Sequence, residues 1–406
     1  MTRASHDLQV ALLVLGGVLI LGALSSNRRR LLSVTALALL VGFVLGPGAT
    51  GVLRFNPRSG FVGDLAAVAL VVILFRDGLE VDGELLQTQW HLPLRKLVLA
   101  MPLTAAIVAV AAHALTSLSW TESFLLGALL SPTDPVLSSN VVTNPNVPRL
   151  IRHSLNLESG LNDGLALPAV LALSAALASG ASHFVWWRFV LENVTVGFAA
   201  GLAFGFLAAW VMPRDTGLES RIPPIQRELY ALGVAFASYA IGLVPPHGNG
   251  LIAVYVAAIT LGIRRPDIRT YVQERAEDIV EIVKVAVFVV FGSLLTLHGM
   301  FSDGWAAIGI VAVTLLVARP VAVFTALIGT ATDTATRAFM SWFGPKGVAT
   351  MTFSLLVLSA HISAGGRIFN IAALAVFCSI IVHGATDVSG AEWISVREAR
   401  ARDVPG

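Results

Sequence analysis

The chain has 406 residues, of which 56% are hydrophobic and 13% are charged, and its mean hydropathy is +0.79. A water-soluble globular protein does not have this balance, so the composition predicts an all-α polytopic membrane protein with one membrane domain over residues 1–406. The formal net charge of +2 says nothing about partners, and the single cysteine, Cys378, excludes an intramolecular disulfide and a cysteine metal cluster.

Thirteen apolar runs of roughly bilayer-spanning length follow one another along the chain with short connections, and each predicts a transmembrane helix. The predicted spans cover residues 8–25, 32–52, 61–78, 94–115, 121–141, 155–178, 185–211, 226–244, 249–263, 276–297, 304–328, 338–360 and 366–385.

Lysine and arginine residues predict the orientation, because they concentrate in the cytoplasmic loops of membrane proteins. With the first loop inside, fifteen of them, including Lys96, lie in inner loops and five lie on the outer face. The N-terminus is then outside, residues 387–406 form a short cytoplasmic tail, and the expected location is the plasma (inner) membrane. Four charged residues at the inner end of the third span are expected to be solvated, namely Arg76, Asp77, Glu80 and Asp82.

Two predicted spans are interrupted by residues that disfavour a helix. The fifth contains Ser-Pro-Thr-Asp-Pro at 131–135, and the twelfth contains Gly-Pro-Lys-Gly at 344–347. If spans one to six and eight to thirteen form two halves, each interruption falls in the fifth span of its half, and the halves are inserted in opposite senses. Such a pattern indicates a transporter site at the bilayer midplane. We therefore expect two inverted six-helix repeats whose interrupted helices cross there.

The interruption of the fifth span predicts unwound backbone inside the membrane. Pro132 and Pro135 remove amide donors on either side of Thr133 and Asp134. Unwound backbone is tolerated at this depth only where it lines a cavity or is buried in protein, so the oxygens of Thr133 are candidate ion ligands. The alternative is a proline kink in which Asp134 caps the second half of its own helix. The two roles are compatible.

The sixth span carries Glu158, Ser159, Asn162 and Asp163 within an apolar run. A charge at the centre of a membrane helix costs roughly 2.5 to 3.5 kcal/mol, so these acids must face protein, water or an ion. Ser159, Asn162 and Asp163 follow helical spacing and share one face. Their oxygens suit a hard monovalent cation, with which a proton would compete at Asp163. The alternative is an acid that is neutral or hydrogen-bonded between helices.

Two basic residues lie deep in the later spans. Arg319 keeps its charge in this setting and needs a partner, and we expect an ion pair with Glu158 that leaves Asp163 free. Lys346 lies at the interruption of the twelfth span, where it is expected to compensate the carbonyl end of the first half of that helix.

Four motifs together resemble the NhaP-type sodium/proton antiporters, the electroneutral branch of the monovalent cation/proton antiporter superfamily. They are SPTDPV, ESGLNDG, ARP and WFGPKG, and the resemblance extends over essentially the whole membrane domain. It implies a homodimer of thirteen-helix subunits. Each subunit would have a core bundle at about 94–178 and 304–385 and a dimerisation or scaffold domain at about 8–78 and 185–297.

The resemblance also implies roles for individual residues. Asp163 would bind cation and proton in turn, with Na⁺ held by Asp163, Thr133 and Ser159 and with Asp134 close by. Glu158 and Asn162 would organise the site. Family members often have arginine at the position of Lys346, so the role of this lysine stays open.

These features predict a secondary active transporter, and not an enzyme, that exchanges Na⁺ for H⁺ one for one in pH and sodium homeostasis. Because position 162 is asparagine and not a second acid, electrically silent exchange is the simplest outcome. The alternatives are K⁺/H⁺ exchange, a cation channel, and an intramembrane aspartyl protease that uses Asp134 and Asp163. The sequence has no phosphate-binding glycine loop and no histidine cluster with ligand spacing, so no cofactor is expected beyond the transported ions. The expected partners are the lipid bilayer and a second copy, with no nucleic acid.

Overall fold

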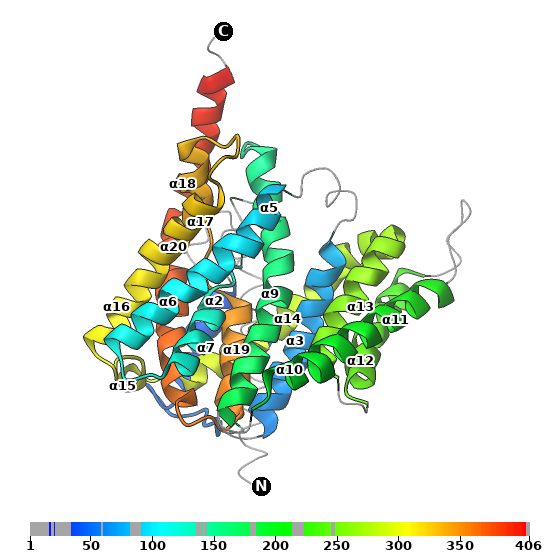
Figure 1. Cartoon of the computed structure of the whole chain (residues 1–406), viewed down its shortest axis with the longest axis horizontal. Coiled ribbons are helices and arrows are strands. Elements are labelled where there is room, and N and C mark those ends of the chain that lie inside the picture. Colours follow the sequence, from blue (N-terminus) through cyan, green and yellow to red (C-terminus); the bar gives the residue numbers. More distant parts are fainter. Residues whose placement is uncertain are drawn as a thin grey trace.

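The computed structural model describes residues 16–17, 20, 34–57, 60–81, 91–134, 141, 144–178, 184–212, 223–244 and 248–402, and every regular element within these ranges is a helix (Figure 1). The longer helices are α2 (Val34–Leu45), α3 (Gly60–Glu80), α6 (Met101–Leu115), α7 (Trp120–Leu130), α9 (Arg149–Ala178), α11 (Val196–Val211), α12 (Pro224–Gly242), α13 (Gly250–Arg264), α14 (Pro266–Leu294), α16 (Trp305–Val313), α17 (Arg319–Ala326), α18 (Thr334–Trp342), α19 (Val348–Ser359) and α20 (Gly365–Arg402). The short elements are α5 (His91–Arg95), α10 (Trp186–Phe189), α15 (Leu297–Met300) and the π-helical turns η1 (Lys96–Ala100), η3 (Val190–Thr195) and η4 (Thr314–Ala318).

Five helical segments in these ranges are long and apolar enough to cross a membrane, namely His91–Leu115, Arg149–Ala178, Trp186–Val211, Trp305–Ala326 and Gly365–Arg397. Each lies on one of the predicted spans. The prediction of an all-α polytopic membrane protein is confirmed. The number of spans stays a prediction, because most of the first run and the second half of the fifth lie outside the described residues.

Local sequence signals fix where several helices begin. At the start of α7, the Ser119 hydroxyl accepts from the Glu122 amide at 3.3 Å while the Glu122 carboxylate accepts from the Ser119 amide at 2.8 Å. Asn249 caps α13 and Asp333 caps α18 with their side-chain oxygens. Each cap satisfies backbone donors that have no partner within the helix, which matters more where water is excluded.

Glycines set the close packing of α11 on α13. Gly197, Gly201 and Gly205 recur at every fourth position of α11. A Cβ atom added at Gly197 would lie 2.8 Å from the carbonyl oxygen of Asn249, and one at Gly205 would lie 2.8 Å from that of Ala257. Small residues of this kind let helix backbones approach closely, which is the main source of helix association in lipid.

The helices fall into two groups that meet at α3 (Figure 1). In Figure 1, α11, α12 and α13 lie on one side, and α6, α16, α17, α18 and α20 lie on the other. Helix α3 packs against α13 and α14 and also against α9 and α19. The boundary between the groups therefore runs between α3 and α9, and α9 carries the acids of the sixth predicted span.

Candidate functional site

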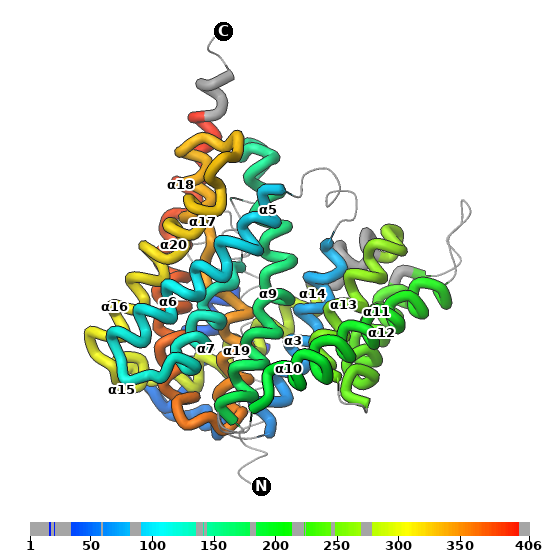
Figure 2. Tube along the Cα trace, in the orientation of Figure 1, coloured from blue at the N-terminus to red at the C-terminus, as the bar shows by residue number. Residues whose placement is uncertain are grey.

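The two predicted interruptions are present, and they contact each other. Helix α7 ends at Leu130 and the chain continues without helix through 131–134, while α18 ends at Trp342 and α19 begins at Val348 (Figure 2). The amide of Asp134 donates to the carbonyl oxygen of Pro345 at 2.9 Å. Two stretches of unwound backbone, far apart in the sequence, thus lie side by side within the helical bundle.

Asp134 caps a helix other than its own. Its Oδ2 atom accepts from the amide of Val348 at 3.1 Å, at the start of α19. The contact between the interruptions brings the free amides of α19 to this carboxylate, whereas the predicted cap on the second half of the fifth span concerns residues outside the described ranges and stays a prediction. The Asp134 side chain also lies against Gly347, where a Cβ atom would collide with it.

Lys346 makes the reciprocal contact. Its Nζ atom donates to the carbonyl oxygens of Pro132 at 3.1 Å and Ser131 at 3.3 Å, just beyond the carboxyl end of α7, and the residue is 1% exposed. The prediction that Lys346 compensates its own half-helix is wrong about the partner. Each interruption instead supplies the charge that the end of the facing helix favours, a carboxylate at an amino end and an ammonium at a carboxyl end.

Asn162 connects α9 to the unwound segment. Its Nδ2 atom donates to the carbonyl oxygen of Thr133 at 2.8 Å and to the Thr133 hydroxyl at 3.0 Å. Asn162, Asp163 and Thr133 are all buried, at 2%, 7% and 5% exposure. Ser159, one turn earlier on α9, is half-buried. The structure thus brings Asn162 into direct contact with Thr133. Asp163 is the residue that follows Asn162 in the sequence.

Two oxygens in this cluster have no hydrogen-bond partner among the residues that the structure describes. They are Oδ1 of Asn162 and Oδ1 of Asp163, and both are buried. Burying a polar atom without a hydrogen-bond partner costs about 1 to 3 kcal/mol of folding stability, and more for a charged group. These two oxygens are therefore candidate ligands for an ion or a proton. Oxygen atoms of carboxylate and amide groups are ligands for a hard cation or, at the carboxylate, for a proton.

Asp77 of α3 is a buried acid beside this cluster, and not the solvated residue that its place near the end of a span predicts. It is 4% exposed, and its carboxylate accepts from Arg76 Nη1 at 2.7 Å and lies close enough to Asp163 for the two to interact electrostatically. The solvated position predicted for it is therefore wrong. Close packing of α3 against Gly160 of α9 brings the two carboxylates together, and the Tyr255 hydroxyl of α13 donates to the Gly160 carbonyl oxygen at 2.9 Å.

Glu158 is held apart from this cluster by two cations. Arg319 Nη1 donates to Glu158 Oε1 at 2.8 Å, and Lys96 Nζ donates to Glu158 Oε2 at 2.6 Å. The Arg319 side chain passes directly over Gly344, which explains why this position has no Cβ atom. Lys96 is 1% exposed, so its assignment to an inner loop is wrong. Glu158 therefore lies in an ion-pair network with Lys96 and Arg319, and both of its carboxylate oxygens are taken up by these cations.

The sequence contains only a weak indication that Lys96 and Asp77 are buried. Lys96 lies at the third position of the span predicted over 94–115, and Asp77 lies next to the last position of the span over 61–78. Charges so close to a span boundary are usually solvated, and only a partner on another helix overrides that expectation.

The sequence is similar to those of curated antiporters. A K⁺/H⁺ antiporter NhaP from Alkalimonas amylolytica is 25% identical over 367 residues, with 88% of this chain and 62% of the relative covered. A K⁺/H⁺ antiporter NhaP2 from Shewanella sp. is 24% identical over 364 residues with the same coverage. The chain thus spans about 62% of the length of these curated relatives.

A solved structure has the same fold. The sodium proton antiporter MjNhaP1 from Methanocaldococcus jannaschii superimposes with a TM-score of 0.79 at 18% identity, covering 95% of this chain and 100% of that one. The family model described as sodium/hydrogen exchanger, transmembrane, matches residues 14–387. With an all-helical bundle and two interrupted helices in contact, and with a match over nearly its whole length, the chain belongs to the sodium/hydrogen exchanger family.

Proposed function

We propose that the chain is a secondary active transporter that exchanges a monovalent cation for a proton across a membrane, with Asp163 binding the two in turn. The observation that carries this proposal is the pair of buried oxygens on Asn162 and Asp163 that lack partners beside the contact of two interrupted helices. A cation would be held by Asp163, Thr133 and Ser159, with Asp134 and Asp77 as neighbouring carboxylates. A proton would take the place of the cation on Asp163.

Na⁺ is the first candidate substrate, and the family description and the name of MjNhaP1 agree with it. K⁺ is the second candidate, and the curated relatives that are named K⁺/H⁺ antiporters favour it. Both ions are hard cations that take oxygen ligands, so the residue types of the site accept either. The selectivity between Na⁺ and K⁺ is set by the size of the ion cavity and the number of its ligands, so the flux measurements with each cation decide between them.

Alternating access would follow from the way the two helix groups meet. The core at about 94–178 and 304–385 carries both interruptions and α9, and the scaffold at about 8–78 and 185–297 carries α3 and α11 to α14. Movement of the core along α3 would expose Asp163 to one side and then the other, since α3 packs on α9 and α19. Rigid-body movement of one bundle against another is the general mode for transporters with paired interrupted helices.

Exchange one for one fits the site, because the residue before Asp163 is asparagine and Glu158 is already neutralised by Lys96 and Arg319. We further propose a homodimer in the plasma (inner) membrane, with the N-terminus outside and residues 387–406 in the cytoplasm. The bias of lysine and arginine toward the inner loops supports this orientation even when buried Lys96 is left out of the count. No enzymatic step and no resident cofactor are part of the proposal.

The test is proton flux in liposomes that contain the purified protein, driven separately by gradients of Na⁺, K⁺ and Li⁺. Wild type should move protons in response to one or more of these cations, and Asp163→Asn should not. Asp64→Asn is the matched control, because Asp64 is an exposed acid on α3. Flux that persists in Asp163→Asn, or cation current without proton movement, would reject the proposal and favour a channel.

A further inference from the structure

Helix α20 carries a short polar stripe inside an apolar, membrane-spanning segment. Ser379, His383 and Thr386 follow one another at spacings of four and three residues, so they share one face of the helix. Ser379 is 0% exposed and His383 is 3% exposed. Helix α20 packs against both α18 and α19, the two helices that flank the second interruption. The exchange mechanism described above uses none of these three side chains, although polar groups so deep in a membrane segment usually have a function.

The His383 imidazole holds the carboxyl end of α18. Its Nε2 atom is 3.0 Å from the carbonyl oxygen of Trp342, the last residue of α18. A carbonyl oxygen can only accept, so Nε2 carries a hydrogen and donates it. The amide of Gly344 donates to the same oxygen at 2.9 Å. In addition, Nε1 of Trp342 donates to the Thr386 hydroxyl at 3.0 Å. Helix α18 therefore ends on two side chains of α20.

Ser379 holds the other side of the interruption. Its hydroxyl oxygen accepts from the amide of Lys346 at 2.8 Å. The same oxygen is 3.1 Å from Nδ1 of His383, and the Ser379 carbonyl oxygen is 2.9 Å from that nitrogen. Without a hydrogen Nδ1 accepts from the hydroxyl, and with one it donates to the carbonyl, so the ring stays bonded to Ser379 in both cases. The two side chains thus form one bridge from the carbonyl of Trp342 to the amide of Lys346.

The stretch under this bridge, residues 343–347, reaches the candidate ion site through two contacts. Nζ of Lys346 donates to the carbonyl oxygen of Pro132 at 3.1 Å, and the amide of Asp134 donates to the carbonyl oxygen of Pro345 at 2.9 Å. Thr133 lies between these two points in the sequence. Unwound backbone has no helical hydrogen bonds of its own, so contacts from outside decide where it lies. The place of the Thr133 oxygens therefore depends on the place of residues 343–347.

We propose that His383 and Ser379 are positioning residues for cation binding, which fix residues 343–347 and, through them, hold the oxygens of Thr133 where the cation needs them. This inference rests on the proposed function. Neither side chain is itself proposed as a ligand. A binding site must keep its ligand atoms within about 0.5 Å of the productive geometry. Loss of the bridge should therefore weaken cation binding more than it slows the movement of the core.

The experiment measures the KM and kcat of proton flux in liposomes, driven by Na⁺, K⁺ or Li⁺. Ser379→Ala and His383→Leu should each raise the KM of the transported cation about fivefold, with kcat within about twofold of wild type. His383→Gln places an amide donor near the position of Nε2, so it should recover most of the wild-type KM. His383→Asn places its amide near the position of Nδ1, which loses the bond to Trp342, and it should resemble His383→Leu.

A binding measurement tests the same point without transport. A cation that binds only the folded protein raises its melting temperature in detergent, and the concentration that gives half of the rise follows the affinity. This concentration should increase about fivefold in Ser379→Ala and in His383→Leu, as the KM does. Because the two residues form one bridge, the double variant should bind little more weakly than either single variant. If His383→Leu does not fold, Ser379→Ala and the comparison of His383→Gln with His383→Asn still decide the question.

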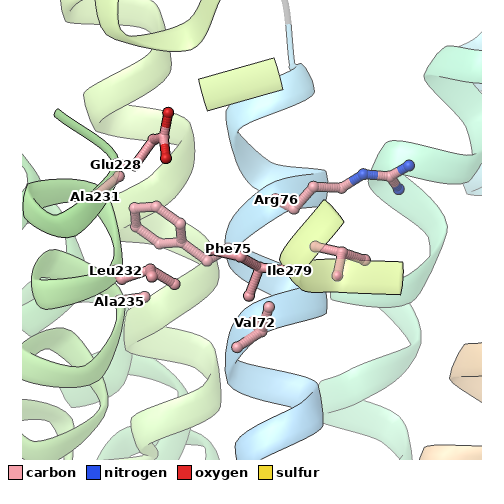
Figure 3. Close-up of a pocket in the computed structure, with 9 residues that line it drawn as sticks. Val72, Phe75, Arg76, Glu228, Ala231, Leu232, Ala235 and Ile279 are labelled. Atoms are coloured by element: carbon pink, nitrogen blue, oxygen red, sulfur yellow. The ribbon is translucent and has the colours of Figure 1, made fainter. Parts of the chain in front are cut away.

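Two controls separate positioning from general damage. Ser389→Ala makes the same change at an exposed position of α20 and should match wild type. Val280 of α14 is 2% exposed and borders a cavity of about 20 Å³ between α3, α12 and α14. Figure 3 shows Phe75, Leu232 and Ile279 around this cavity. Val280→Ala enlarges it, so this variant should lose stability on heating and keep the wild-type KM.

The outcomes distinguish this inference from the proposed function. If wild-type liposomes show no cation-driven proton flux, the proposed function fails. If wild type exchanges but the variants of Ser379 and His383 keep its KM, the positioning role is wrong while the exchange stands. A fall in kcat at unchanged KM, or a KM that rises as much in Val280→Ala as in Ser379→Ala, would also contradict the positioning role.

Discussion

The ion-pair network around Glu158 gives a prediction that can be worked out quantitatively from the structure. Each carboxylate oxygen of Glu158 has its own cation, Lys96 at 2.6 Å and Arg319 at 2.8 Å. Glu158→Gln would leave both cations buried without an anion, and breaking a buried pair costs roughly 3 to 5 kcal/mol. Lys96→Met would leave Glu158 paired with Arg319 and lose one charge-assisted hydrogen bond, worth about 1.5 to 3 kcal/mol.

The order of these losses is therefore the prediction. Glu158→Gln should lower the folding stability by roughly 2 kcal/mol more than Lys96→Met does, when the mid-values of the two ranges are compared. If the difference appears in the barrier to unfolding, the half-life at a fixed temperature should differ about thirtyfold. The assay is the fraction of detergent-solubilised protein that stays monodisperse on size-exclusion chromatography after timed heating. Arg95→Met is the control, because Arg95 is the exposed neighbour of Lys96.

A double variant makes the reasoning refutable. Lys96→Met combined with Glu158→Gln leaves one unpaired cation, whereas Glu158→Gln alone leaves two. The double variant should thus be no less stable than Glu158→Gln, and the two losses should not add. Strictly additive losses, or a Lys96→Met variant as short-lived as Glu158→Gln, would show that Lys96 is not a partner of Glu158 in the way that the distances indicate.

Three further predictions concern local geometry. Gly205→Val should destabilise the packing of α11 on α13 by about 1 to 3 kcal/mol and shorten the half-life on heating, because a Cβ atom there meets backbone. Gly347→Ala should displace Asp134 and lower exchange activity more than it lowers stability, as flux and heating assays would measure. Hydrogen bonding from Thr336, followed by pairing with Arg397, lowers the pKa of Asp333 to about 2. The stabilisation from this cap is therefore complete above about pH 4 and lost as the pH falls toward 2, which hydrogen exchange at the start of α18 would detect.

Each of these has a matched control in the chain. Gly233→Val on α12 and Gly366→Ala on α20 add a Cβ atom where no other atom lies within 4 Å, so both should be nearly neutral. Asp333→Asn can still cap α18 but cannot titrate, so it should remove the pH dependence, whereas Asp333→Ala should remove the cap at every pH. Equal effects in test and control variants would contradict the geometric reasoning.

Most of the fold could be predicted from the sequence, because in a membrane the apolar length of a segment and its backbone hydrogen bonding decide helix position locally. The same holds for the two interruptions, since Pro132 and Pro345 remove backbone donors within apolar runs and both lie where the structure has no helix. The oxygen-bearing face of α9 also follows from spacing alone, and the structure places Asn162 of that face on Thr133.

The pairing of charges between helices could not be predicted in this way. Lys96 and Glu158 are 62 positions apart, and Lys346 and Pro132 are 214 positions apart. Nothing in the spacing of residues along one helix says which residue of another helix will face it. Charges near span ends, such as Asp77 and Lys96, are solvated by default, and only the packing of α3 and η1 on α9 makes them buried partners.

The sequence by itself therefore determined the class of protein, the positions of its described helices and of the two interruptions, and the candidate side chains for a cation site. It could do so because hydrophobic length, proline and helical periodicity act within a single segment. Only the tertiary structure decided that Asp134 and Lys346 each contact the helix end of the facing interruption, that Lys96 and Arg319 both pair with Glu158, and that Asp77 is buried and paired with Arg76. Electrostatic interactions act through space, so their partners are set by how the helices pack.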